Sequence, residues 1–156
     1  MSDRKTHQWV GAVSGAARIA HQSWGQPGCL METIGGGFGG YWTSMLPDAL
    51  EPAISSWHRS ICHSLAAGGV VCSIDQLLSN WARYCREQAD KVRAIQAIQD
   101  PLTLEFRPVV PMNLFQLLAE WFWSFLAGVL GGMTPGYLSH LVLDAGTARG
   151  IPFLGA

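Results

Sequence analysis

Residues 114–133 read LFQLLAEWFWSFLAGVLGGM, and this apolar stretch decides the fold class. Its length, about twenty residues, is that of an α-helix that crosses the hydrocarbon core of a bilayer. Asn113 can cap such a helix at its start, and the triplet TPG at 134–136 is expected to end it. The sequence therefore predicts one helix over 114–133 and a separate helix over 137–145.

A polar stripe runs along this apolar stretch. Gln116, Glu120 and Ser124 follow one another at intervals of four residues, so they share one face of a helix. A lipid-facing helix would need an interior partner for that stripe. Two interpretations stay open: the stripe faces the interior of a bundle or a functional site, or the helix is the core of a soluble bundle with Glu120 on its wet side.

Composition points the same way as the apolar stretch. Only 13% of the 156 residues are charged, 49% are apolar and 18 are glycine, which is typical of a buried or membrane-associated helical protein. The formal net charge is −1, so nucleic acid is not an expected partner. The four cysteines have no C-x-x-C spacing and are expected to be buried, reduced thiols: Cys29, Cys62, Cys72 and Cys85.

Further helices are predicted on both sides of a turn at Gly25 and Pro27. Residues 6–20 are small and apolar, with Thr6 as a candidate N-cap. Residues 29–46 contain the run GGGFGG, which we interpret as a surface for close helix packing because no Gly-Lys-Ser/Thr follows it.

A long helix is expected to begin near Ser60, and its part over 74–99 is predicted to be amphipathic. The apolar residues that recur there at helical spacing are Ile74, Leu77, Leu78, Trp81, Cys85, Val92 and Ile95, and those expected on a solvated face are Arg83, Arg86, Glu87, Asp90, Lys91 and Arg93. Residues 100–111 contain three prolines and read as an extended linker or short strand. The fold prediction is a single all-α domain over 1–156, a bundle of about five helices of which one or more could be embedded in a membrane.

The histidines and carboxylates are the residues whose spacing indicates a chemical function. His140 and Asp144 are four residues apart, so they share one helical face and suit a pair of metal ligands. His58 and His63 are five apart, which places His58 in a loop and His63 in the first turn of the next helix, where both could still reach one ion. His21 has no such partner and is interpreted as an ordinary surface histidine.

Pro47 and Pro52 bracket a short irregular stretch that carries two carboxylates. In this charge-poor chain, seven polar residues lie in apolar neighbourhoods, where burial is costly unless a metal or a partner satisfies them. They are His7, Asp48, Glu51, His58, His63, His140 and Asp144.

Three motifs carry a family resemblance: T-H-x-x-x-G at 6–11, L-P-D at 46–48 followed by H-R-x-x-x-H-S at 58–64, and G-Y-L-S-H-L-x-x-D-x-x-T-x-x-G-I-P-x-L at 136–154. Together they resemble the YdjM-type family of membrane-associated metal-dependent hydrolases over nearly the whole chain except residues 75–112. The resemblance implies a helical protein at the inner membrane, with a His/Asp site similar to that of zinc-dependent phospholipase C-like enzymes.

Carried over by motif, the resemblance implies a set of metal ligands and a set of supporting residues. The ligands are His7, Asp48, His58, His63, His140 and Asp144, and the supports are Arg59, Ser64 and Thr147. The implied cofactor is one or two divalent ions, with zinc ahead of manganese and iron.

The chain departs from the family pattern beside Asp48. Leu50 stands where many members have a second Asp, and an acid follows one residue later as Glu51. Glu51 then replaces the missing group as ligand or general base, or the site holds fewer ions. Ser60 also stands where the family has Gly.

The functional hypothesis is a metal-dependent hydrolase of a phosphoester, such as a phospholipid headgroup or another membrane-bound substrate. In it Glu51 or Asp48 takes a proton from water, and Arg59 stabilises the developing oxyanion. The alternative is a non-catalytic membrane-associated binding or regulatory protein in which the polar or metal cluster is structural. Whether the chain forms a homo-oligomer stays open in both hypotheses. Serine chemistry ranks below both, because Ser64 and Ser139 are adjacent in sequence to their histidines and no G-x-S-x-G is present.

Overall fold

The structure, a computed structural model, describes residues 4–50, 61–94 and 114–146. These residues form five helices: α1 (Arg4–Gln22), α2 (Cys29–Thr43), α3 (Leu46–Leu50), α4 (Leu65–Ala94) and α5 (Leu114–Ala145). No strand occurs within those ranges. The predicted all-α fold of about five helices is therefore confirmed.

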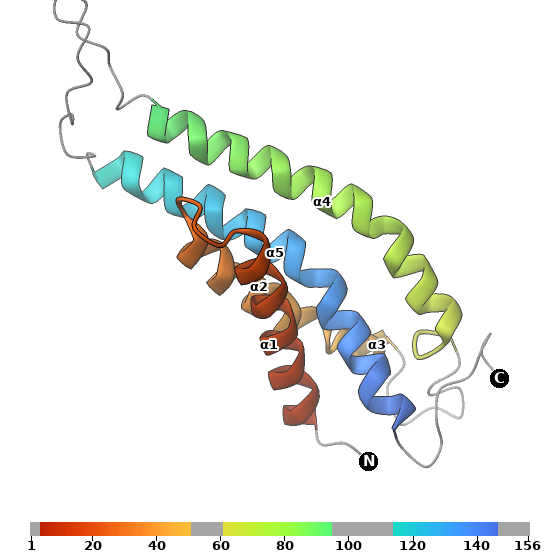
Figure 1. Ribbon diagram of the computed structural model, residues 1–156. Coiled ribbons are helices and arrows are strands. Elements are labelled where there is room, and N and C mark those ends of the chain that lie inside the picture. Colours follow the sequence, from red (N-terminus) through yellow and green to blue (C-terminus); the bar gives the residue numbers. More distant parts are fainter. Residues whose placement is uncertain (1–3, 51–60, 95–113, 147–156) are drawn as a thin grey trace, which may run out of the picture.

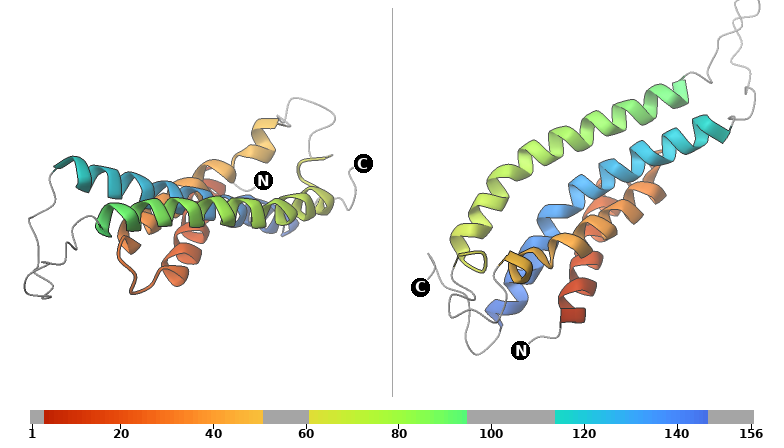
Figure 2. Two further views of the ribbon diagram at one scale, coloured as in Figure 1. Left: turned by 90° about the horizontal axis from the view of Figure 1, so that it is seen from above. Right: turned by 180° about the vertical axis from the view of Figure 1, so that it is seen from behind.

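Helix α5 is the centre of the bundle. It contacts α1, α2, α3 and α4, with α1 and α2 on one side and α4 alongside it on the other (Figures 1 and 2). Helix α4 runs antiparallel to α5 (Figure 1). As a result the start of α1, the short α3, the start of α4 and the end of α5 gather at one end of the molecule (Figure 1).

Glycines allow α2 and α5 to pack with their backbones in contact. A Cβ atom at Gly128 would overlap the carbonyl of Glu32, and one at Gly132 would overlap the carbonyl of Gly36. The run GGGFGG, residues 35–40, therefore serves close helix packing, as predicted. Such small-residue contacts are typical of helices that associate in membranes.

Helix α5 runs without a break through Pro135, so the prediction of two helices separated at 134–136 is wrong. Proline lacks an N–H and forfeits the bond to the carbonyl four residues earlier, here Gly131. Packing on both sides of that point holds the helix together, because Gly132 and Gly136 lie against α2. The hydroxyl of Thr43 also donates to the Met133 carbonyl at 2.8 Å.

Helix α4 begins at Leu65 and not near residue 60, because Ser64 caps it. The Ser64 hydroxyl accepts a hydrogen bond from the backbone N–H of Ala67 at 3.1 Å, which satisfies one of the free donors of the first turn. His63 was expected in the first turn of this helix. It lies instead in the turn before α4.

The prediction for the two faces of α4 is also wrong in part. Ile74, Leu77 and Trp81 are exposed, whereas the residues buried in the bundle are small: Gly68, Ala82, Cys85 and Ala89. Arg86 and Arg93, expected in solvent, instead bond to Glu32 of α2 and Glu120 of α5. Sequence periodicity cannot separate the two faces, since a helix with lipid on its outer side exposes the apolar residues that a soluble helix buries.

Ion pairs tie α4 to each of its neighbours. Arg18 of α1 forms two parallel hydrogen bonds with Asp75, of 2.9 and 2.8 Å. Arg86 reaches Glu32 of α2, and Arg93 reaches Glu120 of α5. The polar stripe on α5 thus faces the bundle interior, and Glu120 is not on a wet side.

Two smaller predictions about helices are wrong, and the prediction for the cysteines is correct only in part. Thr6 is not the N-cap of α1, since that helix already begins at Arg4 and Thr6 lies inside it. Helix α3 replaces the irregular stretch that was expected there, because proline is tolerated in the first turn of a helix. Among the cysteines only Cys85 is buried, and all four are free thiols. Residues 95–99 of the amphipathic prediction and the linker at 100–111 lie outside the described residues.

Helix α5 is long and apolar enough to cross a membrane. Only 28% of its most apolar window is buried inside the molecule, whereas the core helix of a soluble bundle would be mostly buried. Large apolar side chains also point outward on the other helices, among them Val13, Ile34, Phe38, Ile74, Leu77 and Trp81. This surface is consistent with membrane association.

Candidate metal centre

Five of the predicted ligands meet at the end of the bundle where α1, α3 and α5 come together. His7 lies near the start of α1, Asp48 on α3, and His140 and Asp144 one turn apart near the end of α5. His63 comes from the turn before α4. The structure therefore assembles one cluster from four separate segments of the chain.

The ligand atoms lie at distances that suit a shared cation. The Nε2 atom of His140 is 3.4 Å from Asp144 and 3.7 Å from Asp48, and that of His63 is 3.1 Å from Asp48 and 3.6 Å from Asp144. His7 Nε2 is 3.6 Å from Asp144. Ligands at zinc bond lengths in a tetrahedron are about 3.4 Å apart. In each of two triads, which share His140, the ligand atoms lie within 4.8 Å of one another: His7, His140, Asp144 and Asp48, His63, His140.

His140 supplies the strongest sign that a cation belongs here. Its Nδ1 lies 2.6 Å from the Ser44 carbonyl, which can only accept, so Nδ1 carries the proton. In the neutral ring, Nε2 then carries a lone pair, and this atom is buried with no hydrogen-bond partner among the residues that the structure describes. This lone pair faces carboxylate oxygens of Asp48 and Asp144. Three hydrogen-bond acceptors so close together are unfavourable unless a positive charge lies between them.

Contacts around the cluster fix its geometry. The hydroxyl of Tyr137 donates to the Cys62 carbonyl and so ties the turn that carries His63 to α5. Ser64 was expected to support the site closely. Its hydroxyl instead caps α4 and donates to the Ile61 carbonyl at 2.6 Å. The rings of His7 and His140 stack with their centroids 4.1 Å apart.

The cluster is closed on most sides. His63 and His140 are fully buried and Asp144 is nearly so, whereas the side chain of Asp48 is 41% exposed. The hydrogen bond with His63 holds the pKa of the Asp48 carboxyl below its ordinary value, against the opposing effect of burial. Asp48 is therefore an ionised group on the open side of the cluster.

Four of the predicted site residues lie outside the described residues: Glu51, His58, Arg59 and Thr147. Their assigned roles stay predictions. Among the described residues, the polar stripe with Glu120 lies elsewhere on α5 and does not contribute to this cluster.

Two contributors were not predicted from the sequence. Ser44 acts through its backbone carbonyl, which no residue pattern could indicate. Tyr137 acts through a hydroxyl that reaches the carbonyl of a residue 75 positions away. The position of Tyr137 within one helical turn of His140, and its place in the motif G-Y-L-S-H, could have suggested a role.

No family model matches this chain, and no curated protein or solved structure is significantly similar to it.

Proposed function

We propose that the protein is a metal-dependent hydrolase whose divalent ion, zinc in the first place, binds among His7, Asp48, His63, His140 and Asp144. The observation that carries this proposal is the buried Nε2 atom of His140, which faces two carboxylates and has no hydrogen-bond partner within 4–50, 61–94 and 114–146. A neutral imidazole held by a carbonyl on its other nitrogen is the usual state of a histidine that ligates a metal.

The position of each residue in the cluster suggests its role. A divalent ion bound here would lower the pKa of water and polarise a phosphoryl oxygen. His63, His140 and Asp144 are rigidly held and buried, which suits ligands. Asp48, ionised and partly exposed, is placed to take a proton from water on the open side, the role also assigned to Glu51. Arg59 remains the group proposed to stabilise the developing negative charge.

A membrane-bound phosphoester is the proposed substrate class. Exposed apolar side chains surround the end of the bundle that carries the cluster, including Trp9, Leu50, Ile61 and Val142. A lipid substrate could rest against them while its polar group reaches Asp48. The resemblance to YdjM-type proteins supports the same proposal and an inner-membrane location.

The first test is the metal content of the purified chain, measured by elemental mass spectrometry. We expect one or two divalent ions per chain in the wild type and less than about a tenth of that in a His140→Ala, Asp144→Ala variant, since both remove ligands. His21→Ala is the matched control, because His21 is an exposed histidine at the far end of α1. A folded wild type without metal would contradict the proposal.

Hydrolysis is then tested on the metal-loaded wild type with a panel of phosphomonoesters and phosphodiesters and with phospholipids in mixed micelles. Turnover that disappears with a chelator and with His63→Ala, and returns to the wild type when metal is added back, would support the hydrolase. Full activity of the His63→Ala variant would contradict it.

A structural metal site is the second candidate, favoured by the near-complete burial of His63, His140 and Asp144. Structural zinc has four protein ligands, whereas catalytic zinc keeps one position open to water. X-ray absorption on the loaded protein distinguishes the two: four protein ligands without water would favour the structural role.

A further inference from the structure

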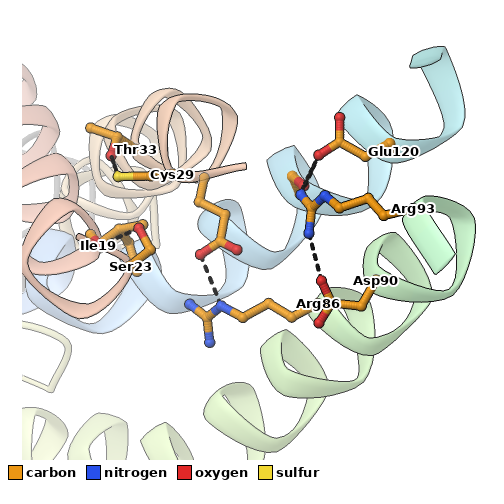
Figure 3. Close-up of polar contacts among 10 residues, drawn as sticks. Ile19, Ser23, Cys29, Thr33, Arg86, Asp90, Arg93 and Glu120 are labelled. Atoms are coloured by element: carbon orange, nitrogen blue, oxygen red, sulfur yellow. Dashed lines mark hydrogen bonds and ion pairs between the residues drawn. The ribbon is translucent and has the colours of Figure 1, made fainter. Parts of the chain in front are cut away.

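Helix α4 lies at the edge of the bundle, and its inner side packs along α5 (Figures 1 and 2). Two arginines on that inner side bond within the molecule. Arg86 bonds to Glu32 of α2. Arg93 bonds to Glu120 of α5 (Figure 3). The opposite side of α4 is exposed along most of its length, so this outer side is available to a molecule beyond the bundle.

A row of exposed polar side chains runs along this outer side, and we call it the outer row. Its members are Ser73, Gln76, Asn80, Arg83 and Glu87. They follow one another at alternating intervals of three and four residues, which places them on one face of the helix. The same alternation defines the seam between two helices of a coiled coil. The spacing therefore fits another long helix as the binding partner.

The surroundings of the outer row are apolar. Val70, Leu77 and Tyr84 border it on one side, and all three side chains are exposed. In a membrane-associated bundle, lipid offers no hydrogen bonds to amide groups such as those of Gln76 and Asn80, so these groups bond to polar groups of a neighbouring helix. Lipid alone is therefore a poor partner for this face.

The outer row is complementary to itself. The Gln76 amide donates to the Oδ1 atom of Asn80 at 3.0 Å, and Arg83 donates to the same oxygen at 3.3 Å. An amide combines donors and an acceptor, so the two amides have further groups that can bond to the same amides of a second copy. Arg83 and Glu87 carry opposite charges one turn apart. Beside a parallel copy, each Arg83 therefore lies next to Glu87 of the other chain.

Insertion in one membrane fixes the orientation of such a pair. Two copies inserted the same way are related by a twofold axis along the membrane normal, so their α4 helices run parallel and each residue of the outer row faces its counterpart. Ser73, Asn80 and Glu87 then occupy the first core position of the seven-residue repeat. A single asparagine at that position fixes the register of a helix pair.

We infer that two copies of this chain associate through the outer row, with their α4 helices parallel and in register. The outer row takes no part in the packing of α4 against α5 or in the metal cluster, so both stay as they are in the single chain. The inference is independent of the proposed hydrolase activity.

The first test measures the dissociation constant of the full chain in detergent, by energy transfer between copies labelled with a donor dye and copies labelled with an acceptor dye. Light scattering on the same samples should give a protein mass of twice 16.9 kDa. Gln76→Leu together with Asn80→Leu should raise the dissociation constant at least about tenfold, because both amides are lost. Gln22→Leu with Gln26→Leu, exposed outside α4, is the matched control and should leave it unchanged. Circular dichroism checks that each variant keeps its helices.

A charge exchange tests the register. Arg83→Glu alone places like charges side by side in the pair, and so does Glu87→Arg alone, so each should weaken association by about three- to tenfold. The double variant Arg83→Glu, Glu87→Arg restores opposite charges across the seam. Its dissociation constant should therefore return close to that of the wild type.

Disulfide formation locates the seam. In a Cys72→Ser background, which removes an exposed thiol beside the outer row, Ser73→Cys should form cross-linked pairs under mild oxidation, because the two copies of one core position face each other. Ile74→Cys is exposed as well but lies about 100° further round the helix, and it should not cross-link.

Four results would each overturn the inference. They are a wild type with the mass of one chain, an unchanged dissociation constant when both amides are replaced, no recovery in the double charge variant, and equal cross-linking of the two cysteine variants.

Discussion

At the scale of single residues, the metal cluster depends on groups that hold its ligands as much as on the ligands themselves. His140 is oriented by the Ser44 carbonyl, and the turn with His63 is held by the Tyr137 hydroxyl. Such outer contacts decide which nitrogen of a histidine is free to bind an ion and where it points.

Tyr137→Phe should weaken metal binding about tenfold while the protein stays folded, because the turn with His63 loses its anchor to α5. Competition with a fluorescent chelator measures the affinity. Tyr84→Phe is the control, since Tyr84 lies on α4, is exposed, and packs its ring against Trp123. Equal affinities for the wild type and Tyr137→Phe would show that the hydroxyl does not position His63.

The candidate site could be predicted from the sequence to the extent that its residues follow local rules. His140 and Asp144 lie one turn apart because the i, i+4 spacing requires it in any helix. His7 and Asp48 reach them only through tertiary packing, and they were predicted from their apolar sequence neighbourhoods and from the family resemblance, not from periodicity. The Ser44 carbonyl could not be predicted at all, since every residue has one.

At the scale of helices, close backbone contact decides how α2 and α5 pack. The packing role of the run GGGFGG was predicted correctly, because such a run has few other uses in a helix, whereas its partners Gly128 and Gly132 on α5 were not predicted. The continuity of α5 and the faces of α4 were predicted wrongly. Local rules for proline take no account of the packing around a helix, here of Gly132 and Gly136 against α2. The rule for amphipathic helices places apolar residues in the protein interior, whereas Ile74, Leu77 and Trp81 of α4 are exposed.

Gly128→Ala should destabilise the bundle by about 1–3 kcal/mol, because its Cβ would overlap the Glu32 carbonyl and force α2 and α5 apart. The unfolding midpoint in detergent reports the change. Gly69→Ala is the matched control: nothing lies within 4 Å of its Cβ position on α4, so the higher helix propensity of alanine should stabilise the protein by up to about 1 kcal/mol. Similar effects of the two substitutions would contradict close packing as the cause.

At the scale of the whole molecule, polar groups collect at two ends and apolar side chains cover the region between them. The metal cluster occupies one end, and the ion pairs of Arg86 and Arg93 occupy the other. Trp42 and Trp81 are among the outward-facing apolar residues of the intervening part. This arrangement is consistent with membrane association.

The purified chain should remain monodisperse only in detergent or lipid, because water would have to solvate its apolar surface. Size-exclusion chromatography with light scattering, with and without detergent, measures this directly. The expected result is loss of the monodisperse peak on detergent removal and its recovery in nanodiscs. A monodisperse chain in plain buffer would show that α5 is a helix of a soluble bundle.

The three ion pairs on α4 also constrain the order in which the protein can assemble during synthesis. Arg18 and Glu32 emerge from the ribosome before α4, so the partners of Asp75 and Arg86 are already present when α4 arrives. The partner of Arg93 is Glu120 on α5, which is made last. A nascent chain that ends before α5 therefore holds Arg93 only through Asp90 of the same helix, and the ion pair that joins α4 to α5 forms only after Glu120 has been made.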